Sequence, residues 1–312
     1  MASKSLVGLA VVLFLASCIL RIKGRDVSKL LGAEHKVELE GTLVGDAKSN
    51  KLAGSTTQGS LIKEASDGYT HVAGYQSKGR VDAPTTWHGV RAKISVWNIS
   101  DVQPLSESSA YIASINNLDG LEFVAAGVHT TKDGIKGCYN DNCPGFVIAN
   151  GSNLFPGQAL APPLSNYGGE TRYITIRIKK DEKTGDWSLY REDKGGPIGG
   201  MTLLGWWPQN LFNKLSDRAN IIQWTGEVNY QYNETGPSMG SGQFSDEQDG
   251  KAASFFGLYG FDFYGRIYNY DYSPIQLVDK PECYDLSPWY HHTFSSPEKS
   301  HFFYGGPSGC SQ

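Results

Sequence analysis

The sequence has little charge and no basic cluster, and this excludes one class of partner. Its 312 residues include 28 Lys and Arg against 32 Asp and Glu, a net charge of −4, and only 19% of residues are charged. Nucleic-acid-binding domains normally concentrate Lys and Arg on one face or along one helix. We therefore expect no nucleic-acid partner.

Several catalytic motifs are also missing. The chain contains no Gly-x-Ser-x-Gly elbow, no His-Glu-x-x-His helix and no glycine-rich phosphate loop that leads into a helix. His291 and His292 are adjacent in an aromatic tail, but a zinc site there would need a third ligand that the sequence does not identify. We predict no metal site and no cofactor.

Only one long hydrophobic run occurs. Residues 6–20 (LVGLAVVLFLASCIL) follow Lys4 and precede a basic segment at residues 21–24. The run is short for a membrane span and is typical of a signal peptide. We predict that residues 1–24 are removed, that the product is secreted to the extracellular space or apoplast, and that it has no membrane association after cleavage. A retained signal anchor is the alternative.

Cysteine usage agrees with an oxidising compartment. Cys18 lies in the expected signal peptide, which leaves Cys138, Cys143, Cys283 and Cys310. Four thiols allow three pairings, and we expect the local one, Cys138 with Cys143 and Cys283 with Cys310. A zinc site is less favoured because the second pair is distant and widely spaced. Three sequons, at Asn98, Asn150 and Asn233, predict N-glycosylation.

The remaining chain divides into two parts. Residues 25–67 are polar and show no sustained period, so we interpret them as a short pro-like or linker segment. Residues 68–312 carry aromatic-rich runs broken by Gly, Asn and Pro. Residues 90–97 and 173–179 alternate apolar and polar side chains, the period of a half-buried strand. We predict an all-β domain, an antiparallel β-sandwich of two sheets with a cleft on one sheet.

The expected elements are mostly strands. One helix is predicted at residues 208–215, which begin with Pro. The strands are predicted at residues 69–75, 90–96, 110–115, 121–129, 145–148, 173–179, 186–191, 202–206, 221–232, 252–263 and 268–278.

The stretch 221–244 carries the strongest indication of chemistry. Glu227 interrupts an apolar strand, and a carboxylate in a half-buried strand is costly unless something satisfies or uses it. Gly240 and Gly242 follow in a turn, where glycine permits unusual backbone angles and close approach. We expect Trp224, Gly226 and both turn glycines to line a cleft with Glu227. The simpler alternative is an exposed strand carboxylate beside a polar turn.

Six ordered segments resemble one protein family, the plant neprosins. The segments are Gly137-Cys-Tyr-Asn-Asp-Asn-Cys-Pro-Gly-Phe-Val147, Gly205-Trp-Trp-Pro-x-x-Leu-Phe212, Trp224-Thr-Gly-Glu-Val228, Met239-Gly-Ser-Gly-Gln-Phe244, Cys283-Tyr-Asp285 and Phe303-Tyr-Gly-Gly-Pro307. Neprosins are secreted glutamic endopeptidases that cleave after proline. The likeness runs from about Tyr69 to Cys310, and it implies a β-sandwich with a cleft, local disulfides and a preceding pro-region.

The resemblance implies two catalytic glutamates, of which this chain has one. Glu227 matches the glutamate of a Trp-Gly-Gly-Glu-Val motif, with Thr225 in place of the first glycine. The second catalytic glutamate belongs to an Ile-Glu-Ala-Gly-Trp motif, and Ala125 occupies its position here. Glu122 is a weak substitute, since an odd offset places it on the opposite face of the strand. His129 shares the face of Ala125, but about 13 Å away.

Two functions follow from these observations. One is a glutamic endopeptidase that acts on proline-rich peptides or proteins through Glu227. The other is a non-catalytic module that binds proline-rich peptide or cell-wall polymer in the same cleft, where aromatic rings would stack on proline or sugar. A glycosidase is a weaker third hypothesis, because it needs two paired carboxylates that the sequence does not identify. Asp262 and Asp271 lie in expected aromatic strands but are interpreted more simply as strand-end or turn residues. The aromatic candidates are Trp206, Trp207, Tyr230, Tyr232 and Trp289.

Overall fold

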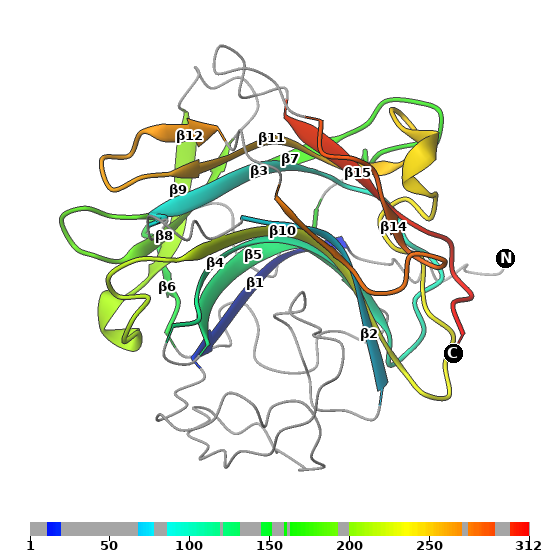
Figure 1. Cartoon of the computed structure of the whole chain (residues 1–312), viewed down its shortest axis with the longest axis horizontal. Coiled ribbons are helices and arrows are strands. Elements are labelled where there is room, and N and C mark those ends of the chain that lie inside the picture. The colour runs from blue at the N-terminus through cyan, green and yellow to red at the C-terminus, as the bar shows by residue number, and fades with distance from the viewer. Residues whose placement is uncertain are drawn as a thin grey trace, which may run out of the picture.

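Two antiparallel sheets pack face to face and form a sandwich (Figure 1). This confirms the predicted all-β fold, an antiparallel sandwich of two sheets. In the computed structural model the described residues are 11–19, 68–77, 86–118, 121–131, 145–151, 159–160, 163–192, 200–269, 274–290 and 300–311, the first of these segments without its side chains. The expected pro-like segment 25–67 lies outside them.

The first sheet has six strands. In spatial order they are β1 (Val11–Ile19), β5 (Glu122–Thr131), β4 (Glu107–Asn116), β10 (Ile221–Gln231), β2 (Gly68–Gln76) and β13 (Ile275–Val278). The edge strand β1 lies within the expected signal peptide, whose cleavage stays a prediction. The long strands β4 and β10 occupy the middle of the sheet.

The second sheet has nine strands. Its path runs through β14 (Asp285–Leu286), β15 (His301–Gly305), β11 (Ala253–Phe261), β3 (Gly89–Ser95), β7 (Tyr173–Lys180), β8 (Trp187–Glu192), β9 (Met201–Trp207) and β6 (Val147–Ile148), and β12 (Ile267–Asn269) pairs with β11. Two 3₁₀ turns, η3 (Gln209–Leu211) and η4 (Ser245–Glu247), complete the described elements.

Alternation of apolar side chains builds the core between the sheets. In β3 the residues Val90, Ala92 and Ile94 are buried, and β7 supplies a matching apolar row that the period-two pattern predicted. From the facing sheet, Ile222 and Trp224 of β10 enter the same cluster. The eleven largest fully buried side chains of the described residues are all aromatic, which accounts for the aromatic-rich composition.

The six-stranded sheet is buried on its other face as well. It arches in Figure 1, with the concave face turned away from the nine-stranded sheet. On that face Tyr111, Ala113, Ile115, Phe123 and Ala125 form a second apolar cluster. Strands β4, β5 and β10 are therefore enclosed on both sides, which is unusual for an antiparallel sheet.

The expected strands need two corrections. The single strand expected at residues 268–278 contributes β12 and β13, which belong to different sheets. Strands β14 and β15 were not predicted, although β15 pairs with β11 over four positions. Their residues lie in an aromatic tail without a clear period, so the sequence pattern alone did not reveal them.

The helix expected at residues 208–215 is wrong. Only the short turn η3 forms, and Phe212 ends it with extended backbone angles (φ −114°, ψ 156°). The next three backbone amides, at Asn213, Lys214 and Leu215, donate to the Glu122 carboxylate at 2.8 Å each. The three hydrogen bonds to this carboxylate stabilise the non-helical backbone more than helix propensity would stabilise a helix, because charge-assisted hydrogen bonds are strong.

We predict that Glu122→Gln destabilises the fold by about 3 kcal/mol, since the neutral amide offers one acceptor atom in place of two and leaves backbone donors unsatisfied. Urea unfolding measures the change. Glu182→Gln is the matched control, because the Glu182 side chain is 51% exposed and lies 3.9 Å from its Lys179 partner. Equal midpoints for the two variants would contradict the assigned role of Glu122.

Candidate functional site

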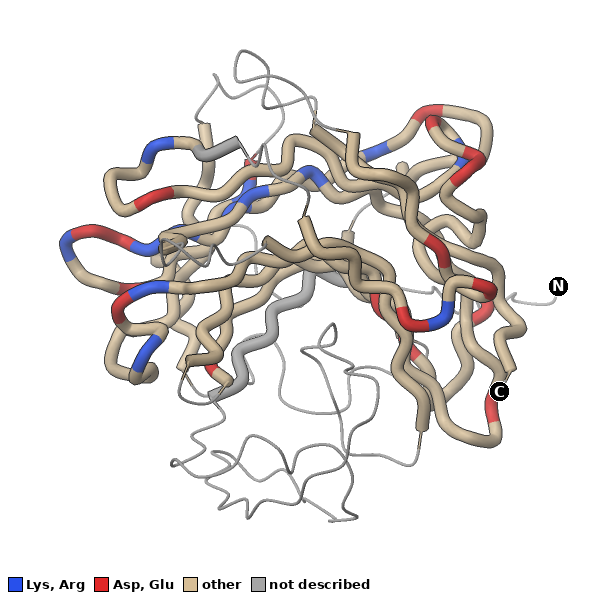
Figure 2. Tube along the Cα trace, viewed as in Figure 1, with Lys and Arg blue, Asp and Glu red and all other residues tan. Residues whose placement is uncertain are grey.

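Glu227 lies at the centre of the arched sheet. Its neighbours in register are Val72 on β2 and Ser109 on β4, and Ser109 in turn lies opposite His129 on β5. Among the described side chains of this sheet, the only charged Asp, Glu, Lys or Arg residues are Glu107, Glu122 and Glu227. The charges marked in Figure 2 lie mainly outside it.

The Glu227 carboxylate is buried and held at both oxygens. Its residue exposure is 0%. The Tyr111 hydroxyl donates to Oε2 at 2.9 Å, and the Asn229 side-chain amide donates to Oε1 at 3.0 Å. Hydrogen bonds of this kind stabilise the ionised form of a carboxyl group and fix its orientation. The simpler expectation of a solvent-exposed strand carboxylate is therefore wrong.

A second carboxylate, Glu107, lies beside Glu227. The Asn229 Nδ2 atom that donates to Glu227 also donates to Glu107 Oε1 at 2.7 Å. The distance between Oε1 of Glu227 and Oε1 of Glu107 is therefore at most the sum of these two hydrogen-bond lengths. Glu107 is also less enclosed than Glu227, with a side-chain exposure of 19%.

Glu107 was not among the predicted site residues, because the strand was expected to begin at Ala110. In the structure β4 begins at Glu107 and gains three residues at that end. The signal that could have found it is local. Glu107, Ser109 and Tyr111 stand at alternate positions, so an earlier strand start places all three on the face of Glu227.

His129 completes this polar group. Its Nδ1 atom lies 3.5 Å from Glu107 Oε2, and its side chain is 1% exposed. Burial lowers the pKa of His129 to about 4 from its ordinary 6.5. A separation of 3.5 Å is long for an N–H···O contact, so the carboxylate offsets little of the burial effect. Above this pKa the imidazole is neutral.

Ala125 lies some way from this group. Its partners in register are Ala113 on β4 and, through it, Gln223 on β10. That row is four residues along the strand from Glu227, or about 13 Å. Ala125 belongs to the apolar cluster with Tyr111 and Phe123, so no carboxyl group occupies the position.

The chain matches the family model named Neprosin over residues 116–307. It belongs to the neprosin family. The match includes Ala125, Glu227 and Asn229, whereas Glu107 and Tyr111 precede it. The family segment therefore supplies one carboxylate of the polar group, and the strand upstream of it supplies the other.

Glu122 is not brought to this group. It lies opposite Asn116, seven residues along β5 from His129, and its oxygens are engaged by the amides of residues 213–215. As the odd offset predicted, it lies on the opposite face from Ala125. Its role in this neprosin-family chain is to anchor a loop.

The expected cleft glycines and Trp224 face the other way. Trp224 is buried between the sheets, where its indole donates to the Arg91 carbonyl at 3.1 Å. A Cβ atom at Gly226 would lie 2.3 Å from the Tyr304 ring, so only glycine fits. Gly240 and Gly242 have φ angles of 66° and 79°, which favour glycine. These residues support the sandwich core and its turn rather than the surface around Glu227.

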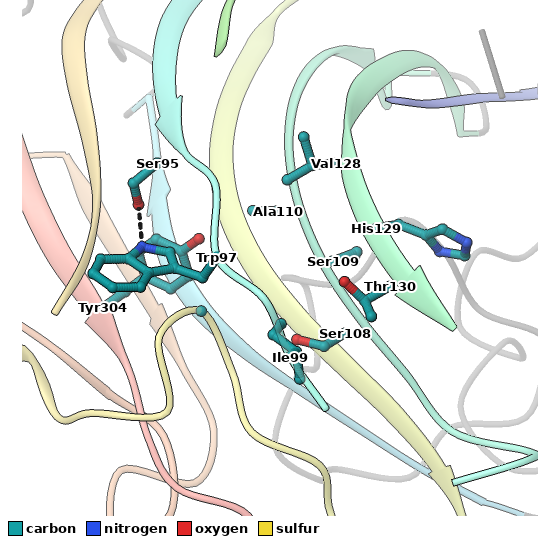
Figure 3. Close-up of a pocket in the computed structure, with 11 residues that line it drawn as sticks. Ser95, Trp97, Ile99, Ser108, Ser109, Ala110, Val128, His129, Thr130 and Tyr304 are labelled. Carbon is teal, nitrogen blue, oxygen red and sulfur yellow. Dashed lines mark hydrogen bonds between the residues drawn. The ribbon is translucent and has the colours of Figure 1, made fainter. Parts of the chain in front are cut away.

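A small cavity lies behind β4, between the sheets (Figure 3). It measures about 20 Å³, which is room for about one water. Ser108 and Tyr304 line it, and the imidazole of His129 points away from Trp97 and Tyr304 in the close-up. This cavity is too small for a peptide and opens on the side opposite Glu227.

The remaining expected sites have mixed outcomes. Cys283 and Cys310 form the predicted disulfide. Cys138, Cys143, His291, His292 and Asp271 lie outside the described residues. Asn98, Asn150 and Asn233 are exposed, which suits glycosylation but leaves it a prediction. Asp262 binds Arg266 in the turn after β11, and the described residues contain no group of three or more His, Cys, Asp or Glu that could hold a metal.

Two further observations bear on access and location. Of the helices in the described part of the chain, none is long and apolar enough to cross a membrane.

Of the aromatic candidates for stacking, Trp207 and Tyr230 are buried, whereas Tyr232 is 60% exposed. Trp289 is half-buried and packs against the core, so three of the five candidate rings serve packing.

We predict that His129 makes the fold less stable as the solution becomes acidic. The folded protein holds this imidazole neutral down to about pH 4, while the unfolded chain protonates it below about pH 6.5. The unfolded state thus binds more protons across this window, so stability falls with decreasing pH, by about 2 kcal/mol between about pH 7 and pH 5. Urea unfolding of wild type and His129→Gln at both pH values measures it. Identical pH dependence in the two proteins would refute the assignment.

Proposed function

We propose that this neprosin-family protein is a secreted endopeptidase that cleaves proline-rich polypeptides after proline under acidic conditions, with Glu227 as a catalytic carboxyl group. The observation that carries the proposal is the retained Glu227 carboxylate, buried at the centre of the sheet and hydrogen-bonded at both oxygens. Family membership supplies the reaction class as an inference.

General-base catalysis of peptide hydrolysis requires a carboxylate that is held in one position. A buried carboxylate is costly, and here Tyr111 and Asn229 offset part of that cost while holding the group in one orientation. An oriented, ionised carboxylate can take a proton from a water that attacks a peptide carbonyl. Because Glu227 is fully enclosed, neighbouring segments must move before a polypeptide reaches it.

A non-catalytic binding module is the second candidate, and Ala125 is the observation that favours it. The position that carries the second glutamate in the resembling proteins lies here in an apolar row. An extended peptide rich in proline could pack against such a row, since proline rings present apolar surface. In that case the hydrogen bonds to Glu227 are structural.

We predict that Glu227→Gln lowers kcat/KM for a proline-rich peptide by about 100- to 10,000-fold, the usual contribution of a general acid or base. The full secreted chain is assayed at mildly acidic pH, with and without acid pre-incubation, and mass spectrometry locates the cleaved bonds.

Glu282→Gln is the control, because Glu282 is an exposed glutamate with a side-chain exposure of 67%. Equal cleavage by wild type and Glu227→Gln would refute the peptidase proposal. Binding of the peptide without cleavage, at equal affinity in both proteins, would favour the binding module.

A further inference from the structure

We propose that Glu107 is the second catalytic carboxyl group of this site and takes over the role of the glutamate that position 125 lacks. The inference rests on the proposed function. It is new with respect to the family match, because Glu107 precedes the matched segment 116–307. It also accounts for how a chain with alanine at position 125 could keep a two-carboxylate reaction.

The geometry of Asn229 carries the inference. One side-chain amide nitrogen donates to Glu227 Oε1 at 3.0 Å and to Glu107 Oε1 at 2.7 Å. Two hydrogen bonds from a water molecule, each about 2.8 Å, span the same gap. The two oxygens are thus no farther apart than two such hydrogen bonds, so a water beside the Asn229 nitrogen could contact both carboxyl groups at once.

The orientation of the Asn229 amide follows from its partners. An ionised carboxylate and the carbonyl oxygen of a protonated carboxyl group both accept hydrogen bonds, so the NH₂ group faces the two glutamates. The Thr70 hydroxyl donates to Asn229 Oδ1 from the neighbouring strand β2, which satisfies the other end of the amide. Asn229 is therefore a positioning residue, fixed by β2, that sets the separation of the carboxyl groups.

The environments of the two glutamates divide their roles. Two close carboxyl groups favour a state with one protonated and one ionised. Glu227 receives two strong hydrogen bonds, from Tyr111 and Asn229, which suits the ionised base. Glu107 has 19% side-chain exposure, so it can recover a proton from solvent, and the neutral His129 beside it adds no positive charge that would favour ionisation.

The reaction step balances with these groups alone. Glu227 takes a proton from water as the water oxygen bonds to the peptide carbonyl carbon. Glu107 then gives its proton to the amide nitrogen as the carbon–nitrogen bond breaks, which releases a carboxylic acid and an amine. The proton left on Glu227 is lost and Glu107 is reprotonated, with no oxidant, reductant or metal required.

A serine mechanism on the same strands is the competing possibility. Ser109 lies opposite His129, whose Nδ1 faces Glu107, so the three residue types of a Ser–His–Glu triad are neighbours in space. The Ser109 hydroxyl, however, donates to the Glu227 backbone carbonyl, at 3.5 Å. We therefore expect Ser109→Ala to retain wild-type activity.

The decisive experiment compares pH profiles of kcat/KM. We predict that Glu107→Gln lowers the maximum by about 100- to 10,000-fold and abolishes the alkaline limb, because that limb reports the acid that must be protonated. Glu227→Gln should instead abolish the acid limb. Should Glu107→Gln fail to fold, Glu107→Asp is used, and we expect reduced activity with both limbs kept. Glu282→Gln again serves as the control.

A double-mutant cycle tests the bridge. If Asn229 acts by placing Glu107 against Glu227, then Asn229→Ala costs much less in the Glu107→Gln background than in wild type. Wild-type rates and profile in Glu107→Gln, with Glu227→Gln inactive, would overturn the inference and leave the proposed function standing. An inert wild type would overturn both, and an inactive Ser109→Ala would replace the carboxyl pair with the serine mechanism.

Discussion

The enclosure of β10 on both faces is the constraint on which the site depends. One face of this strand packs against the nine-stranded sheet, and the other carries Gln223, Thr225 and Glu227, all fully buried. Buried polar groups are tolerated only when their hydrogen bonds are made inside the protein. Tyr111 and Asn229 meet that demand for Glu227, so the same contacts that permit burial also orient the carboxylate.

The sequence predicted those parts of the structure in which local pattern and tertiary packing agree. Alternation located β3 and β7, and an isolated carboxylate in an apolar strand drew attention to Glu227. Prediction from the sequence failed where a group distant in the chain determined the local backbone structure. Glu122 captures the amides that a helix after Pro208 would have used, and no local signal carries that information.

Of the two carboxylates of the site, only Glu227 could be predicted, for a related reason. Glu107 stands at the first residue of β4, and strand ends are the least certain feature of a period-two pattern. Its meeting with Glu227 depends on register between β4 and β10, which backbone pairing fixes. Closeness in sequence to Glu227 was also misleading for Trp224 and Gly226, since successive residues of one strand face opposite sides of the sheet.

The register of the strands explains why alanine can occupy position 125. Ala125 lies four residues along the sheet from the row of Glu227, among apolar neighbours that leave a carboxylate there without partners. Glu107 lies only two residues from that row, hydrogen-bonded to Asn229 and partly open to solvent. A carboxyl pair at this end of β10 needs no glutamate at position 125, provided that Asn229 and Thr70 stay in place. The polar row along β10 and β4 therefore decides whether the site can carry out two-carboxylate chemistry.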